Sequence, residues 1–108
     1  MIVEYLIQTP NALASFAEEH GLTLGVYERL PKDMGDRWTE AMRYYSCFQC
    51  ADIKEGNMPR PTCGNGATPT KAVRNYLKKI SGAHLVVDAG TSRRRDIQVP
   101  DLQPPFIG

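Results

Sequence analysis

The sequence predicts one α+β domain over 1–108, in which a mostly antiparallel sheet carries two helices packed on one face. A length of 108 residues suits a single domain. Short segments rich in β-branched and aromatic residues follow one another along the chain, whereas only two segments have helical periodicity. Hydrophobic residues make up 42% and charged residues 23%, which excludes collagen-like, low-complexity and strongly disordered chains.

The N-terminal third predicts a strand, a helix and a second strand. Residues 2–7 are rich in β-branched and aromatic side chains, which is typical of a strand. Thr9-Pro10 suits a helix start, because the hydroxyl can cap the first turn and proline lacks an N–H that would be unpaired there. The helix is expected over 10–20, with Gly21 as its C-terminal cap. Alternating apolar residues over 22–29 predict a half-buried strand.

The middle of the chain predicts two loops around a region of strand. Turn-forming residues fill 30–37, which is expected to be a loop. Aromatic and apolar residues over 38–53 predict one or two strands. Residues 54–67 hold three glycines and two prolines, which predicts the longest loop of the chain. Loops of this length are often functional, so this is the first place to expect a contact surface.

The C-terminal third predicts a helix and a hairpin. The helix begins at Thr68-Pro69, ends at Ser81-Gly82 and is the clearest element of the sequence. Its expected buried face consists of Ala72, Val73, Tyr76, Leu77 and Ile80. Two strands over 84–89 and 95–99, joined by a short turn, predict a hairpin. The tail over 101–108 contains two adjacent prolines and is expected to be irregular.

The net charge of +1 hides an uneven distribution of charge. Residues 1–36 hold six acids and two bases, whereas 60–95 hold eight bases and one acid. Such an asymmetry can steer association with an anionic partner. The alternative is an ordinary solvated surface. The candidate binding residues are Arg93, Arg94, Arg95, Lys71, Arg74, Lys78, Lys79 and Arg60.

Two anionic partners fit these cations. The first is the acidic surface of another protein. The second is nucleic acid, whose phosphates arginine can contact bidentately and whose bases Trp38, Tyr45 or Phe48 could stack on. The isoelectric point near 7.7 is below that of a dedicated nucleic-acid-binding domain, which favours the protein partner.

Three cysteines raise the question of metal or redox chemistry. Cys47 and Cys50 have C-x-x-C spacing, and zinc binding would need Cys63 and either His20 or His84 to complete four ligands. The residues around the pair predict a strand, in which positions three apart face opposite sides. Small buried or half-buried thiols in a sheet are therefore the favoured interpretation, with no metal and no cofactor. An odd cysteine count without a signal peptide or a membrane-length apolar run predicts a reduced, cytoplasmic protein.

Catalytic motifs are lacking, so the chain is not expected to be an enzyme. The glycines of 64–68 precede a helix but match neither the P-loop nor the Rossmann pattern, and are interpreted as permitting a tight turn into that helix. His84 and Asp88 could form an acid–base pair on one strand. A cross-strand ion pair between Asp88 and either Arg93 or Arg95 is the favoured alternative.

The segment GNGATPTKAVRNYLKKISGAHLVVDA, with RRDIQVPDL after it, resembles short proteins encoded by phages and prophages. Its Gly-x-Gly-Ala-Thr-Pro start is also similar to antitoxins of the Hic type, which use a small α/β sheet domain to block a ribonuclease toxin. The resemblance implies a phage-type accessory protein that binds and inhibits a protein of the host or of its defence, CRISPR effectors included. We therefore expect a non-enzymatic binding protein in the host cytoplasm, with nucleic-acid binding through 60–95 as the alternative.

Overall fold

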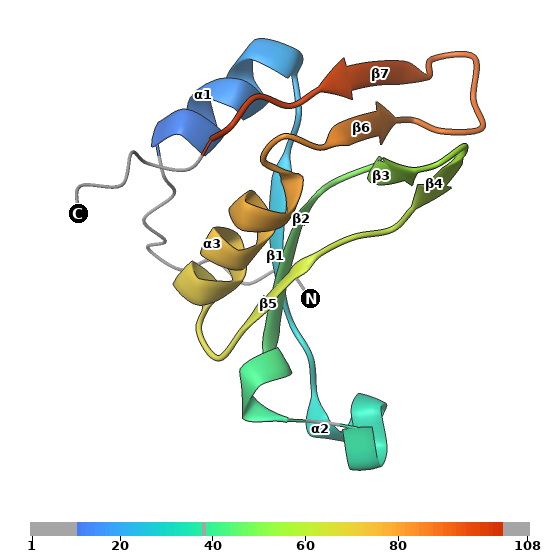
Figure 1. Ribbon diagram of the computed structural model, residues 1–108. Helices are drawn as coiled ribbons and strands as arrows, with labels where there is room; N and C mark the ends of the chain where they lie inside the picture. Colours follow the sequence, from blue (N-terminus) through green and yellow to red (C-terminus); the bar gives the residue numbers. More distant parts are fainter. Residues whose placement is uncertain (1–10, 38, 103–108) are drawn as a thin grey trace.

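The computed structural model describes residues 11–37 and 39–102 (Figure 1). The predicted strand over 2–7, the Thr9-Pro10 helix start, Trp38 and the tail over 103–108 lie outside the described residues. The elements in chain order are α1 (Asn11–His20), β1 (Leu24–Glu28), α2 (Pro31–Met34), the 3₁₀ turns η1 (Gly35–Arg37) and η2 (Glu40–Met42), β2 (Tyr44–Phe48), β3 (Ala51–Glu55), β4 (Met58–Arg60), β5 (Gly64–Gly66), α3 (Pro69–Ile80), β6 (His84–Val87) and β7 (Arg95–Gln98).

The predicted α+β class is confirmed, and the antiparallel strands are divided between two sheets. One sheet has the order β1-β2-β5 and the other has the order β4-β3-β6-β7. The chain passes from the first sheet to the second at Gln49 and Cys50, where Cys50 adopts a positive φ of 59°. The backbone N–H of Asp88 donates to the Cys50 carbonyl at 2.8 Å, which fixes this corner to the second sheet.

The C-terminal end of α1 and the start of α3 are capped as the sequence predicts. Gly21 has a φ of 65° and donates to Glu18 O, while Leu22 N–H donates to Ala17 O, so α1 closes in the paired hydrogen bonds of a Schellman motif. At the start of α3 the Thr68 hydroxyl accepts from the backbone N–H of Lys71 at 3.2 Å. The five apolar residues expected on the inner face of α3 are all buried.

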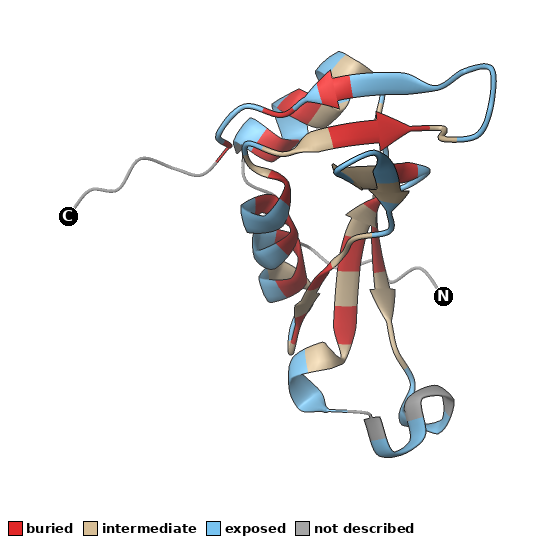
Figure 2. Cartoon of the chain, turned by 45° about the vertical axis from the view of Figure 1, so that its right-hand side comes forward, coloured by how far each residue is buried: buried red, intermediate tan, exposed pale blue. Residues whose placement is uncertain are grey.

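One hydrophobic core joins both sheets and both long helices, as the buried segments of Figure 2 show. Phe48, at the end of β2, is 1% exposed and occupies the centre of this core. Its ring lies 6.2 Å from that of Phe16 in α1 and meets the edge of Tyr76 in α3 at 5.5 Å. Burial raises the pKa of Tyr76 to about 12, so the Tyr76 hydroxyl stays neutral at physiological pH.

Two expected loops contain regular elements, and one residue of the expected irregular tail is buried. The prediction of a long loop over 54–67 is wrong, because β3 and β4 form a hairpin across Gly56 (φ 61°) and β5 follows this hairpin. A glycine with positive φ at the first central position suits a tight two-residue hairpin turn. The loop over 30–37 contains α2 and η1, and η2 stands where strand was expected before Tyr44. Leu102, in the predicted irregular tail, is buried in the core.

Gly64 and Gly66 have a packing role that the sequence interpretation missed. Neither has a positive φ, so the proposed tight turn into the helix is not the reason for glycine. A Cβ on Gly64 would collide with the backbone of Ala72 and Tyr76, and one on Gly66 would meet Ala72 N at 2.5 Å. The two glycines therefore let α3 lie directly on β5, and this contact positions the outer face of the helix.

Candidate functional site

The outer face of α3 carries a row of exposed cations. Lys71, Arg74 and Lys78 are exposed and lie three and four residues apart, so they share one side of the helix. We call these three residues the cationic face of α3. None of the three makes an ion pair with another described residue, and α3 contains no acidic residue. The face is therefore a positive surface that nothing in residues 11–37 and 39–102 neutralises.

The rest of α3 is fastened to β5. Lys79 Nζ donates to the Cys63 carbonyl at 2.9 Å, and Asn75 Nδ2 donates to the Asn65 carbonyl. These bonds direct Lys79 towards the sheet, away from the cationic face. They also tie the flank of α3 next to the cationic face to β5, so the cationic face has a fixed orientation on the body of the protein.

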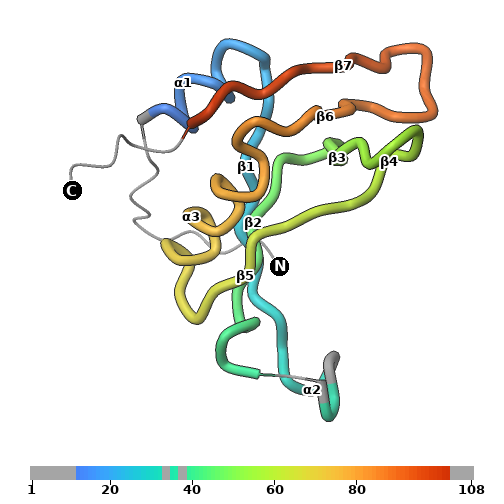
Figure 3. Tube along the Cα trace, viewed as in Figure 1, coloured from blue at the N-terminus to red at the C-terminus, as the bar shows by residue number. Residues whose placement is uncertain are grey.

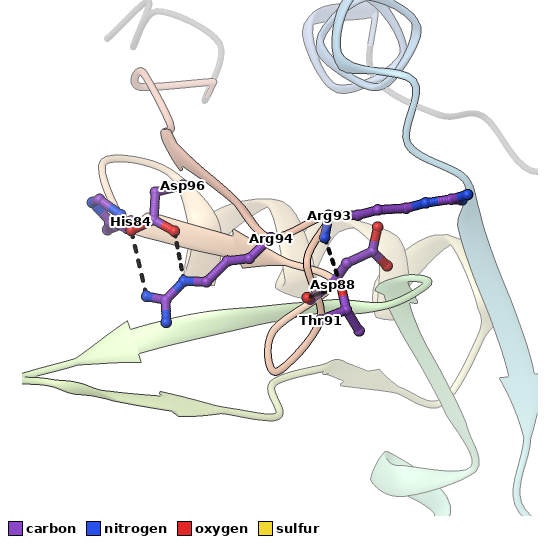
Figure 4. A network of polar contacts seen from close by, with 6 residues as sticks. All are labelled: His84, Asp88, Thr91, Arg93, Arg94 and Asp96. Atoms are coloured by element: carbon purple, nitrogen blue, oxygen red, sulfur yellow. Dashed lines mark hydrogen bonds and ion pairs between the residues drawn. The ribbon is translucent and has the colours of Figure 1, made fainter.

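The arginine triplet (Arg93, Arg94 and Arg95) is dispersed by the structure, in the connection between β6 and β7 and at the start of β7. Arg94 Nε binds Asp96 Oδ1 at 3.0 Å, and Arg95 Nη2 donates to His20 O at the end of α1. Arg93 is exposed, and only its backbone N–H is bonded, to the Thr91 hydroxyl (Figure 4).

The predicted basic residues do not form one patch. Arg60 of β4 pairs with Glu55 at 3.3 Å. Figure 1 and the trace in Figure 3 show the tips of both hairpins of the four-stranded sheet on one side of the molecule and α3 on the other. The side chains of four of the eight predicted residues bind other groups of this chain. Three of the remaining four residues make up the cationic face.

A histidine, a carboxylate and an arginine meet on the pair of strands β6 and β7 (Figure 4). Asp96 Oδ2 lies 3.3 Å from His84 Nε2, while its other oxygen binds Arg94. The hydrogen bond from Arg94, helped by His84, lowers the pKa of Asp96 below 3.8. The expected pairings of Asp88 are wrong: Asp96 is the partner of His84 and of an arginine, because its position in β7 is diagonal to His84 across the ladder.

Replacing Asp96 with asparagine is expected to lower stability at neutral pH and to have little effect in acid. Because the pKa of Asp96 is lowered on folding, its contribution is present above the ordinary value of 3.8 and is lost as the pH falls through the lowered pKa. The urea midpoint of Asp96→Asn should lie below that of the natural protein at neutral pH, and the gap should close well below pH 3.8. Asp88→Asn is the matched control. A pH-dependent gap for Asp88→Asn and none for Asp96→Asn would contradict the assignment.

The outer face of the three-stranded sheet holds an aromatic and guanidinium stack. The rings of Tyr27 and Tyr45 stack at 4.9 Å, and the guanidinium of Arg29 lies 4.3 Å from the centre of Tyr45. Arg29 Nη1 also donates to Asn65 Oδ1 at 2.6 Å and to the Met42 carbonyl at 2.8 Å. Sequence reasoning missed Arg29. Because side chains alternate along a strand, the sequence places Tyr27 and Arg29 on the same face, and this was the signal that could have identified Arg29.

The structure shows where two of the three residues expected to stack on bases lie. Tyr45 already lies between Tyr27 and Arg29. Phe48 is 1% exposed, so the expectation that it could stack on a base is wrong: it faces the core on the other side of β2. Trp38 lies outside the described residues.

The three thiols occupy three different environments. The region 38–53 forms two strands, β2 and β3, and the C-x-x-C spacing spans the corner between them. Cys50 is exposed in that corner, so the expectation of a buried or half-buried thiol is wrong for Cys50. Cys47 and Cys63 are half-buried, and burial raises the pKa of Cys47. Among the residues that the structure describes, no three His, Cys, Asp or Glu side chains are grouped so that they could hold a metal ion.

The described residues contain no helix that is long and apolar enough to cross a membrane. Comparison with family models, with curated proteins and with solved structures finds no match to this chain.

Proposed function

We propose that this protein is a non-enzymatic binding protein that docks the cationic face of α3 on an acidic surface of another protein. The observation that carries the proposal is the row of Lys71, Arg74 and Lys78, exposed on a helix without acidic residues and unpaired among the described residues. A rigid array of this kind attracts an acidic partner, because its charges need not be released from internal ion pairs before binding.

The arrangement of aromatic residues favours a protein partner over nucleic acid. Sequence-independent binding of single strands combines a basic groove with aromatic side chains on which bases stack. Here the stacked Tyr27 and Tyr45 lie on the face of the three-stranded sheet opposite to α3, and Arg29 covers Tyr45. One strand of nucleic acid could not use the cationic face and these rings together.

The resemblance to short phage proteins extends the proposal to a class of partner. A phage-type protein of this size would act in the host cytoplasm and inhibit a host or defence protein by covering an acidic surface. The alternative is binding of nucleic acid phosphates by the same lysines and arginine.

The test compares two pairs of charge reversals that change the net charge equally. Lys71→Glu with Lys78→Glu alters the cationic face, and Lys32→Glu with Arg93→Glu alters exposed cations elsewhere. Fluorescence anisotropy at low salt would measure binding of a labelled polyglutamate peptide. We expect the first pair to weaken binding about tenfold, since two attractions become repulsions. The second pair should change it by less than about twofold, because distant charges are screened.

A labelled DNA duplex, measured in the same way, decides between the partner classes. Tight, strongly salt-dependent binding of the duplex that is lost in the Lys71→Glu, Lys78→Glu protein would replace the proposal with nucleic-acid binding. Equal effects of the two pairs on the polyglutamate peptide, or no binding of it by the natural protein, would also overturn the proposal.

A further inference from the structure

We propose that Cys47 and Cys63 are a site of reversible oxidation, at which a small disulfide such as oxidised glutathione produces an intramolecular disulfide. The strand register places the two residues together. In the antiparallel pair of β2 and β5, Tyr45 is opposite Asn65 and Ser46 is opposite Gly64. One more step along this register brings Cys47 opposite Cys63.

The side chain of Cys63 lies on the side where a continuation of β5 would place it. Its Sγ lies 3.8 Å from Asn65 Oδ1, so residues 63 and 65 face the same side, as alternate residues of a strand do. Tyr45 and Cys47 occupy the matching positions in β2. Directly opposite residues of an antiparallel pair have Cβ atoms about 4.5–5.5 Å apart. A disulfide needs about 3.5–4.5 Å, so a small approach of the two strands suffices.

The surroundings assign different roles to the two thiols. Arg29 Nη2 lies 3.7 Å from Cys63 Sγ, so a guanidinium stands where the negative charge of a Cys63 thiolate would form. Cys47 packs against the hydrophobic core, and both burial and the neighbouring Cys63 raise its pKa. Cys63 is therefore the thiol that attacks first and Cys47 the one that resolves. Cys50 is exposed in the corner after β2 and takes no part.

The exchange proceeds in two balanced steps. The Cys63 thiolate attacks one sulfur of oxidised glutathione, the glutathione disulfide breaks, and one glutathione leaves as a thiolate that takes a proton. Cys47 then loses its proton and attacks the Cys63 sulfur, which releases the second glutathione. Two protein thiols have been oxidised and one oxidised glutathione has been reduced to two thiols.

The test uses the folded full-length chain in native buffer with oxidised glutathione. We expect mass spectrometry of the digested protein to show peptides joined through Cys47 and Cys63. In a Cys50→Ser protein, the product should have lost two hydrogens and retain no glutathione. Its urea midpoint should rise on oxidation, because the new bond closes a loop that the unfolded chain would otherwise leave open.

The single replacement Cys47→Ser is the matched control. Made in the Cys50→Ser background, it should stop the reaction at the mixed disulfide, with one glutathione retained on Cys63 and no rise in the midpoint. Retention of glutathione on both Cys47 and Cys63 in the Cys50→Ser protein would overturn the proposal. Linkage through Cys50 in the natural chain, or resistance of both thiols to oxidised glutathione, would overturn it as well. None of these outcomes depends on the partner proposed above.

Discussion

Replacement of Phe48 by alanine is expected to lower the free energy of unfolding by about 4 kcal/mol. Phe48 is 1% exposed and touches Phe16 of α1 and Tyr76 of α3 with its ring. It also ends β2, directly before the corner at which the chain crosses to the second sheet. Truncation there opens a cavity where both helices and both sheets meet.

Urea unfolding of the variant, followed by circular dichroism, would measure this loss. A loss of about 4 kcal/mol is a large part of the 5–15 kcal/mol that stabilises a typical domain. Phe48→Leu keeps most of the side-chain volume and should cost about 1 kcal/mol. Equal losses for alanine and leucine would show that the site collapses around a smaller side chain, and would contradict the central position of Phe48.

Replacement of Gly64 by alanine is expected to cost about 3 kcal/mol, although the change adds only one methyl group. The added Cβ would collide with backbone atoms of Ala72 and Tyr76, which cannot rotate away as the end of a side chain can. Either β5 or α3 must move. Movement of β5 would also shift Cys63 and Asn65, and with them the bonds that hold Lys79 and Asn75 of α3.

Gly56→Ala is the matched control for this effect. Gly56 has a positive φ of 61°, but a Cβ there would meet no atom within 4 Å. The cost of that change is the strain of the left-handed conformation, about 1 kcal/mol. Urea midpoints of the two variants separate collision from backbone strain. A Gly56→Ala protein less stable than Gly64→Ala would contradict the close packing of β5 on α3.

The cationic face of α3 could be predicted from the sequence because a helix is a local structure. Side chains three and four residues apart share a side whatever surrounds the helix. The same five apolar residues that identify the inner face leave Lys71, Arg74 and Lys78 on the outer one. Thr68 and Gly21, which delimit the two long helices, also act within one turn, and they were predicted correctly.

The partners of the other cations could not be predicted in this way. Arg94 binds Asp96, Arg95 binds the end of α1, and Arg60 binds Glu55, and only the arrangement of the strands shows that these groups meet. A run of three arginines therefore contributes less free charge than its sequence suggests. Counting charges along the chain overstates a binding surface wherever folding brings carboxylates or carbonyls to the same place.

By itself, the sequence determined the α+β class, the bounds and inner face of α3, the C-terminal end of α1, and which cations of α3 face outward, because each depends on contacts within about one turn of chain or on alternation along a strand. Only the tertiary structure decided the division into two sheets, the glycine contact between β5 and α3, and the proximity of Cys63 to Cys47. These features join residues of different secondary-structure elements. They depend on which strands pair and in what register. Because the backbone hydrogen bonds between strands are the same for every residue type, the sequence alone does not show which strands pair.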